Sequence, residues 1–189
     1  MQQRLRLARL SCGACPGEPW GILPTRLNKG EVSEVVTQLC KVGDFVRRLR
    51  TQLRFGALSR APLCLLRLEL KGVVAECEWV ARPPDPWDSD LPRAVGEHNA
   101  SLQALEDAMA VRQLLFYLLP GVESAVFRVY RQSTAEAAEL IITGEVTREE
   151  PNLRVLSLAM RAKLCGFHFW LAEGTLETLQ PEEYAISNS

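Results

Sequence analysis

The chain has 189 residues, of which 47% are hydrophobic and 24% are charged. Such a chain can bury most of its apolar side chains in one core without disulfides or metals. No apolar run reaches the roughly 20 residues of a membrane span, and no secretory signal is recognisable, so we expect reduced cysteines and a cytoplasmic or nuclear protein.

The net charge of −1 conceals an uneven distribution along the chain. Residues 1–61 contain 11 Lys/Arg and 4 Asp/Glu, whereas residues 62–189 contain 11 Lys/Arg and 19 Asp/Glu. The basic part indicates a surface for nucleic acid, a membrane or an acidic partner, unless the two halves neutralise each other in the fold.

Residues 1–29 are rich in proline and glycine and predict an irregular basic arm, with a targeting segment as the alternative. Residues 30–180 are expected to form a single α+β domain, followed by a frayed tail over 181–189.

A long amphipathic helix is predicted from Asn28 to about Gly56, because valines and leucines recur at steps of three and four residues. Four arginines gather near its end: Arg47, Arg48, Arg50 and Arg54. They are candidates for binding phosphates or an acidic protein surface, and the structural alternative is a solvated helix face.

The segment from Leu63 to Val80 predicts a β-hairpin that turns at Lys71 and Gly72. This register makes one face wholly apolar, with the pairs Leu70/Val73, Leu68/Ala75, Leu66/Cys77 and Cys64/Trp79, and places Arg67 opposite Glu76 on the other. It leaves Leu63, Leu65 and Val74 on the outer face.

Prolines then keep residues 83–92 out of helices and central strands. Trp87, between Asp85 and Asp88, is a candidate anchor for a partner in this loop. Alternatively, Trp87 folds back over the edge of the hairpin.

The remaining pattern predicts a helix over 99–119, strands over 125–131 and 139–147, a helix over 152–164 and a central strand over 167–171. The order is α-ββ-α-ββ-α-β. We therefore predict an α+β fold with an antiparallel sheet of about five strands packed on helices.

Cys12 and Cys15 form a C-x-x-C motif, and Cys165 with His168 repeats the spacing, so these four residues are a candidate zinc or thiol site. Prolines and glycines after Cys15 argue against a redox helix, and about 150 residues separate the two pairs. No nucleotide, metalloprotease or hydrolase motif is present, so an enzyme and a cofactor are not expected.

The sequence predicts a non-catalytic protein-interaction or scaffolding subunit of a hetero-oligomer. Its candidate partner-binding residues are Trp87, Asp85, Asp88, Leu65 and Val74, joined by Leu63 and Trp170 as an exposed apolar patch. A nucleic-acid accessory protein that uses the arginines is the alternative, and a zinc or thiol enzyme is the second alternative.

Overall fold

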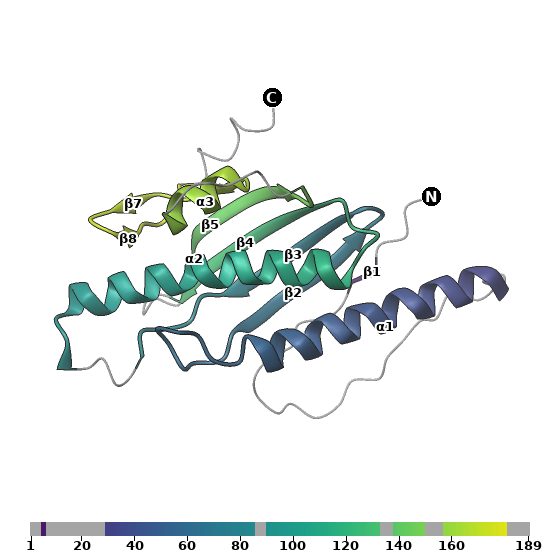
Figure 1. Cartoon of the computed structure of the whole chain (residues 1–189), viewed down its shortest axis with the longest axis horizontal. Helices are drawn as coiled ribbons and strands as arrows, with labels where there is room; N and C mark the ends of the chain where they lie inside the picture. The colour runs from purple at the N-terminus through teal and green to yellow at the C-terminus, as the bar shows by residue number, and fades with distance from the viewer. Residues whose placement is uncertain (1–4, 7–28, 86–89, 133–137, 150–156, 181–189) are drawn as a thin grey trace.

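The computed structural model describes residues 5–6, 29–85, 90–132, 138–149 and 157–180, which form an α+β fold. The helices are α1 (Lys29–Gln52), α2 (Arg93–Leu118) and α3 (Leu158–Leu164), and the strands are β1 (Leu5–Arg6), β2 (Cys64–Lys71), β3 (Val74–Val80), β4 (Ser124–Gln132), β5 (Ala138–Thr147), β6 (Phe167–His168), β7 (Leu171–Ala172) and β8 (Thr175–Leu176) (Figure 1). The predicted tail, most of the arm and residues 152–156 of the predicted third helix lie outside the described residues.

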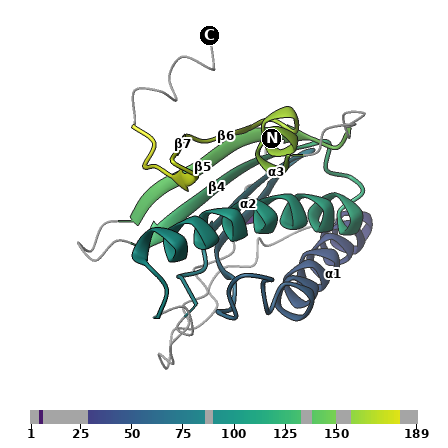
Figure 2. The same cartoon turned by 60° about the vertical axis from the view of Figure 1, so that its left-hand side comes forward.

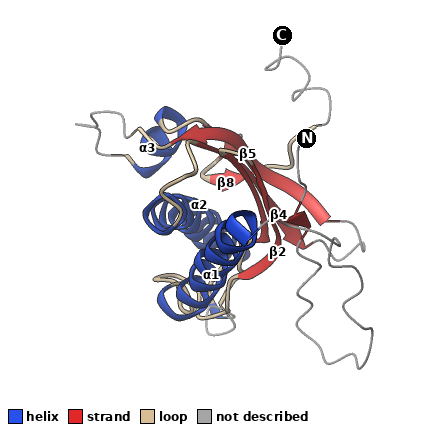
Figure 3. Cartoon of the chain, turned by 90° about the vertical axis from the view of Figure 1, so that its right-hand side faces the viewer, coloured by secondary structure: helices blue, strands red, loops and turns tan. Residues whose placement is uncertain are grey.

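The main sheet has the order β1-β2-β3-β4-β5-β6. Its neighbours are antiparallel except β3 and β4, which run parallel, so the prediction of a wholly antiparallel sheet is wrong. The reason is α2, a helix of 26 residues that carries the chain back along the sheet before β4 begins. Helices α1 and α2 lie on the same face of the sheet, and no helix of the described residues covers the other face (Figures 2 and 3).

The hairpin of β2 and β3 exists, but its predicted register is wrong. Lys71 pairs with Val74, so the turn consists of Gly72 and Val73 rather than Lys71 and Gly72. Gly72 has a φ of 64°, which glycine adopts without the steric cost that a Cβ atom would add. Arg67 consequently pairs with Glu78 instead of Glu76.

A β-bulge between Leu65 and Arg67 reverses the faces of the first part of β2. Before the bulge Leu65 lies opposite Trp79 in the core, and after it Leu68 lies opposite Cys77. The prediction that Leu65 and Leu63 belong to an exposed patch is therefore wrong, since both are buried. Simple alternation could not reveal the extra residue.

Helix α2 begins at Arg93, six residues before the predicted start at Asn99. Gly96 resembles a helix breaker in the sequence, yet it lies inside the first turns, where a Cβ atom would stand 4.0 Å from the Cβ of Pro84. The helix therefore packs closely against the proline-rich segment.

The last predicted strand is not central, because β6 lies at the edge of the sheet and pairs with β5. Beyond it the chain forms a hairpin, β7–β8, that the sequence pattern did not predict. Glu173 and Gly174 make the turn, with φ of 51° and 82°, as in a type I′ turn. Trp170 precedes this hairpin and is 62% exposed.

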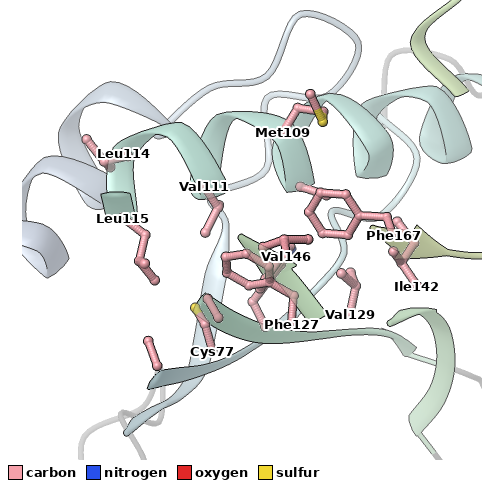
Figure 4. Packing of buried hydrophobic residues seen from close by; sticks show 14 of the residues in the cluster. Cys77, Met109, Val111, Leu114, Leu115, Phe127, Val129, Ile142, Val146 and Phe167 are labelled. Atoms are coloured by element: carbon pink, nitrogen blue, oxygen red, sulfur yellow. The ribbon is translucent and has the colours of Figure 1, made fainter. Parts of the chain in front are cut away.

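The core lies between α1, α2 and the sheet, as the predicted pairing of helices with one face of the sheet requires. Trp79 contacts Phe127 edge to face at 5.5 Å between ring centroids, and Phe127 stacks on Phe167 at 5.6 Å. Figure 4 shows Val111 and Leu115 of α2 directed toward this layer. Aromatic pairs of this kind stabilise beyond the area they bury.

Gly144 allows β6 to approach β5. A Cβ atom at this position would lie 2.2 Å from the Gly166 carbonyl oxygen and 2.9 Å from the Cα of Phe167. We predict that Gly144→Ala lowers the free energy of unfolding by about 1–3 kcal/mol, because backbone cannot move aside as a flexible side chain can. Urea unfolding measures the loss.

Gly43→Ala is the matched control. Gly43 is exposed within α1, and an added Cβ atom would meet nothing within 4 Å. This change is expected to stabilise the protein by about 0.5–1 kcal/mol through helix propensity. Equal stability of the two variants would contradict the close approach of β5 and β6.

Candidate binding surface at the end of helix α1

The C-terminal end of α1 carries exposed arginines. Val42, Phe45 and Leu49 occupy the buried face of the helix at helical spacing. The arginines of the last turns fall outside this stripe and are exposed: Arg47, Arg48 and Arg50, followed by Arg54 just after the helix. The structure thus places all four predicted basic residues at the surface.

An aromatic ring lies beside these cations. Phe55 is 61% exposed, and the guanidinium carbon of Arg54 is 5.2 Å from the centroid of its ring. Arg60, also exposed, lies on the segment that follows. We call Arg47, Arg48, Arg50, Arg54, Phe55 and Arg60 the α1-end surface.

Most charges of the α1-end surface have no acidic partner among the residues that the structure describes. Arg47 forms an ion pair with Asp44 at 3.0 Å. Within the described ranges, Arg48, Arg50, Arg54 and Arg60 form no ion pair. In this part of the chain, the four side chains are therefore exposed cations that no carboxylate pairs.

Arginines in β4 and just after β5 form ion pairs or hydrogen bonds within the protein. Arg128 and Arg131 pair with Glu78 and Glu139 at 2.9 and 2.7 Å. Arg148 donates to the carbonyl oxygen of Phe116 at 2.7 Å and to that of Leu119 at 2.8 Å, at the C-terminal end of α2. The contrast separates structural arginines from those of the α1-end surface.

The loop that carries Phe55 and Arg60 is held by hydrogen bonds from the Arg82 side chain. The side chain of Arg82 is fully buried and donates to the Asp107 carboxylate at 2.7 Å. It also donates to the carbonyl oxygens of Leu53, Arg54 and Ala61, the one to Arg54 at 3.1 Å. One cation thus satisfies carbonyl groups at the end of α1 that the helix itself cannot pair.

Gln103 completes this buried cluster. Its side-chain oxygen accepts from the backbone N–H of Leu58 at 2.7 Å, and its amide nitrogen donates to Asp107 at 3.0 Å. Burial raises the pKa of the Asp107 carboxyl, and the hydrogen bonds from Arg82 and Gln103 oppose this rise. We refer to Arg82, Gln103 and Asp107 as the buried hub.

The proline-rich segment holds the same loop from another side. Ser59 donates to the carbonyl oxygen of Pro83 at 2.9 Å, and the backbone N–H of Arg60 donates to Asp85 at 3.0 Å. Asp85 is thus placed to position the loop, and its role in partner binding stays a prediction. Trp87 and Asp88 lie outside the described residues.

The outer face of the sheet is a second charged surface, but its charges neutralise one another. Arg67 and Arg128 both contact Glu78, at 3.5 and 2.9 Å, and Lys71 contacts Glu76 at 2.5 Å. The hydrogen bond from Lys71 is the main reason that the pKa of Glu76 is lowered. Val74, predicted to bind a partner, is half-buried beside this network, and that role stays a prediction.

The candidate zinc or thiol residues are only partly described. Cys165 is buried and His168 is exposed on β6, while Cys12 and Cys15 lie outside the described residues. No group of three or more His, Cys, Asp or Glu side chains within the described part of the chain is arranged to hold a metal. Burial raises the pKa of the Cys77 thiol, which disfavours its reactive thiolate.

Comparison with known protein families, curated proteins and solved structures finds no match to this chain. None of the helices in the described ranges has the length and apolar character that a membrane span needs. The function is therefore inferred from the residues of this chain alone.

Sequence reasoning identified the exposed arginines but missed the buried hub. The available signal was Asp107, a charged residue at helical spacing from the apolar residues Ala104 and Val111, with Gln103 one turn earlier on the same side. Arg82 carried no comparable signal, because its partners are 25 residues away or are backbone carbonyls.

We predict that Arg82→Met lowers the free energy of unfolding by about 3–5 kcal/mol, because Asp107 stays buried without its cation. Amide hydrogen exchange at Leu58 should accelerate with it. Arg93→Met is the control, since the Arg93 side chain is 92% exposed, and it should change stability by less than about 0.5 kcal/mol. Similar effects of both changes would contradict a structural role for the hub.

Proposed function

We propose that this protein is a non-catalytic binding subunit that contacts an acidic protein partner through the α1-end surface. The observation that carries the proposal is a group of exposed arginines that form no ion pair with any described residue, Arg48, Arg50, Arg54 and Arg60. An acidic partner would supply the missing charges and accelerate association by electrostatic attraction.

Two properties of the surface support a protein partner. Arginine and aromatic side chains are enriched among the residues that contribute most to protein interfaces, and Arg54 with Phe55 offers both. The loop is already held by Arg82 and Gln103, so binding would cost little further ordering of its backbone.

Reversal of two charges tests the proposal. We predict that Arg48→Glu with Arg50→Glu weakens capture of native partners about tenfold, because attraction becomes repulsion. Affinity purification from cells, followed by quantitative mass spectrometry, measures the captured proteins. The matched control is Arg93→Glu with Arg161→Glu, which changes the same charge at exposed positions on other helices.

The samples should be treated with nuclease before capture. Acidic proteins that persist after nuclease and are lost in the Arg48/Arg50 variant would support the proposal. Equal loss in the control variant, or an unchanged set of partners in both, would contradict it, as would a wild-type protein that captures nothing.

A nucleic-acid function is the second candidate, because Phe55 is exposed beside the arginines. Single-stranded nucleic acids bind where cations track phosphates and an aromatic ring stacks on a base. This combination would give salt-dependent binding with little sequence preference.

We predict for this candidate that Phe55→Ala weakens binding of a fluorescent single-stranded oligonucleotide about tenfold at low salt, since one stacked base is lost. Fluorescence anisotropy measures the affinity. Tyr117→Ala is the control, because Tyr117 is 74% exposed on α2 and lies outside the α1-end surface. Affinity unchanged by Phe55→Ala, or absent in the wild type at low salt, would end the nucleic-acid hypothesis.

A further inference from the structure

A pocket of about 250 Å³ opens between the end of β3, the first half of α2 and β8. Much of its wall is apolar: Pro62, Val80, Pro84, Ala100, Ile141 and Leu176 contribute to it. This pocket could not be predicted from local sequence patterns, because its walls come from six separate segments of the chain.

Two polar side chains in the wall, Ser101 and Arg131, already have partners. Ser101 donates to the Glu97 carbonyl oxygen at 2.8 Å and accepts from the Leu176 N–H at 2.9 Å. Arg131 is bound to Glu139 at 2.7 Å and to the Leu176 carbonyl oxygen at 3.0 Å. A polar ligand would lose its hydration without gaining hydrogen bonds from these two side chains. The pocket therefore favours an apolar ligand.

The size of the pocket limits the guest. Small-molecule and cofactor sites typically occupy about 300–1,000 Å³, so this pocket falls just below that range. One large side chain, inserted from a chain that remains at the surface, matches the volume better. Pockets that receive such anchors are typical of the central part of protein interfaces.

The pocket wall and the loop of the α1-end surface share a supporting residue. Arg82 belongs both to the pocket wall and to the buried hub that holds the loop of Phe55. Pro62 lines the pocket two residues after Arg60, whose backbone is bound to Asp85 beside Pro84. The pocket wall and Arg60 therefore lie on adjoining segments of the chain.

We propose that the pocket receives one large apolar side chain from an extended, acidic segment of a protein partner. This inference rests on the proposed function and specifies its partner: acidic residues would contact the arginines of the α1-end surface, while the apolar side chain supplies the anchor. An entirely acidic surface would leave the pocket unused.

Two synthetic peptides test the anchor. Both carry a fluorescent label and four alternating aspartate and glutamate residues on each side of a central residue, which is tryptophan in one and alanine in the other. Wild-type protein is expected to bind the tryptophan peptide about tenfold or more tightly than the alanine peptide, because one large side chain is buried. Fluorescence anisotropy at low and high salt measures both affinities.

Ala100→Phe is designed to fill the pocket with a side chain of the protein itself. It should abolish the preference for tryptophan and leave the affinity for the alanine peptide unchanged. Ala94→Phe is the matched control on the same helix, because Ala94 is exposed and does not line the pocket. The control should keep the preference.

A second measurement does not depend on the folding of a variant. In methyl NMR spectra of the wild-type protein, the tryptophan peptide should shift the signals of Ala81 and Ala100, both of which line the pocket, and the alanine peptide should leave them unshifted. If the tryptophan peptide leaves either methyl signal unshifted, the tryptophan binds elsewhere and the proposal is overturned.

Failure of the pocket and failure of the proposed function give different results. Equal affinity of the wild type for both peptides, persistence of the preference in Ala100→Phe, or no binding of either peptide at about 1 mM would overturn the pocket proposal. If both peptides bind equally and the Arg48/Arg50 variant loses both, the acidic-partner function stands without the anchor. Binding that is insensitive to salt and to the Arg48/Arg50 variant would contradict that function.

Discussion

The buried contact between Arg82 and Asp107 is the interaction on which the organisation of this protein depends. A guanidinium group removed from water is tolerated only when a carboxylate and further acceptors surround it, and here Asp107 and the carbonyl oxygens of Leu53, Arg54 and Ala61 do so. The contact joins the end of β3 to the middle of α2 and to the loop after α1. Since those segments are distant in the sequence, their relative positions are set by one polar cluster as well as by apolar packing.

This contact matters for function because it holds the backbone of the exposed loop after α1 in place. Phe55 and Arg60 lie at the surface, while Gln103 binds the backbone between them and Arg82 binds the backbone on either side. Surface loops are generally the mobile part of a domain, and a loop held by this many hydrogen bonds departs from that tendency. The arrangement suits recognition, because a rigid surface loses less entropy on binding, and it supports the proposed role of the α1-end surface and the adjoining pocket.

The fold could be predicted from the sequence where the pattern is local. The apolar spacing of valines and leucines such as Val42, Val46 and Leu49 identified α1, and alternation identified β2 to β5, because helix and strand periods follow directly from backbone geometry. The register of the hairpin could not be predicted in the same way. Both candidate turns place apolar residues together on one face of the hairpin. The bulge at Leu65 adds one residue to β2, and only contacts with Trp79 and the rest of the core can favour that extra residue.

The sequence alone determined the existence of the main helices, four long strands and the basic end of α1, because these depend on residue type and spacing over a few turns. The tertiary structure decided what those arginines are available for. Arg82 and Arg48 are chemically identical, yet one is buried against Asp107 and the other is exposed without an acidic partner among the described residues. It also decided the parallel pairing of β3 with β4 and the pocket beside Ala100. These features arise from contacts between distant segments, whose free energies depend on the whole packed arrangement and not on any one stretch of chain.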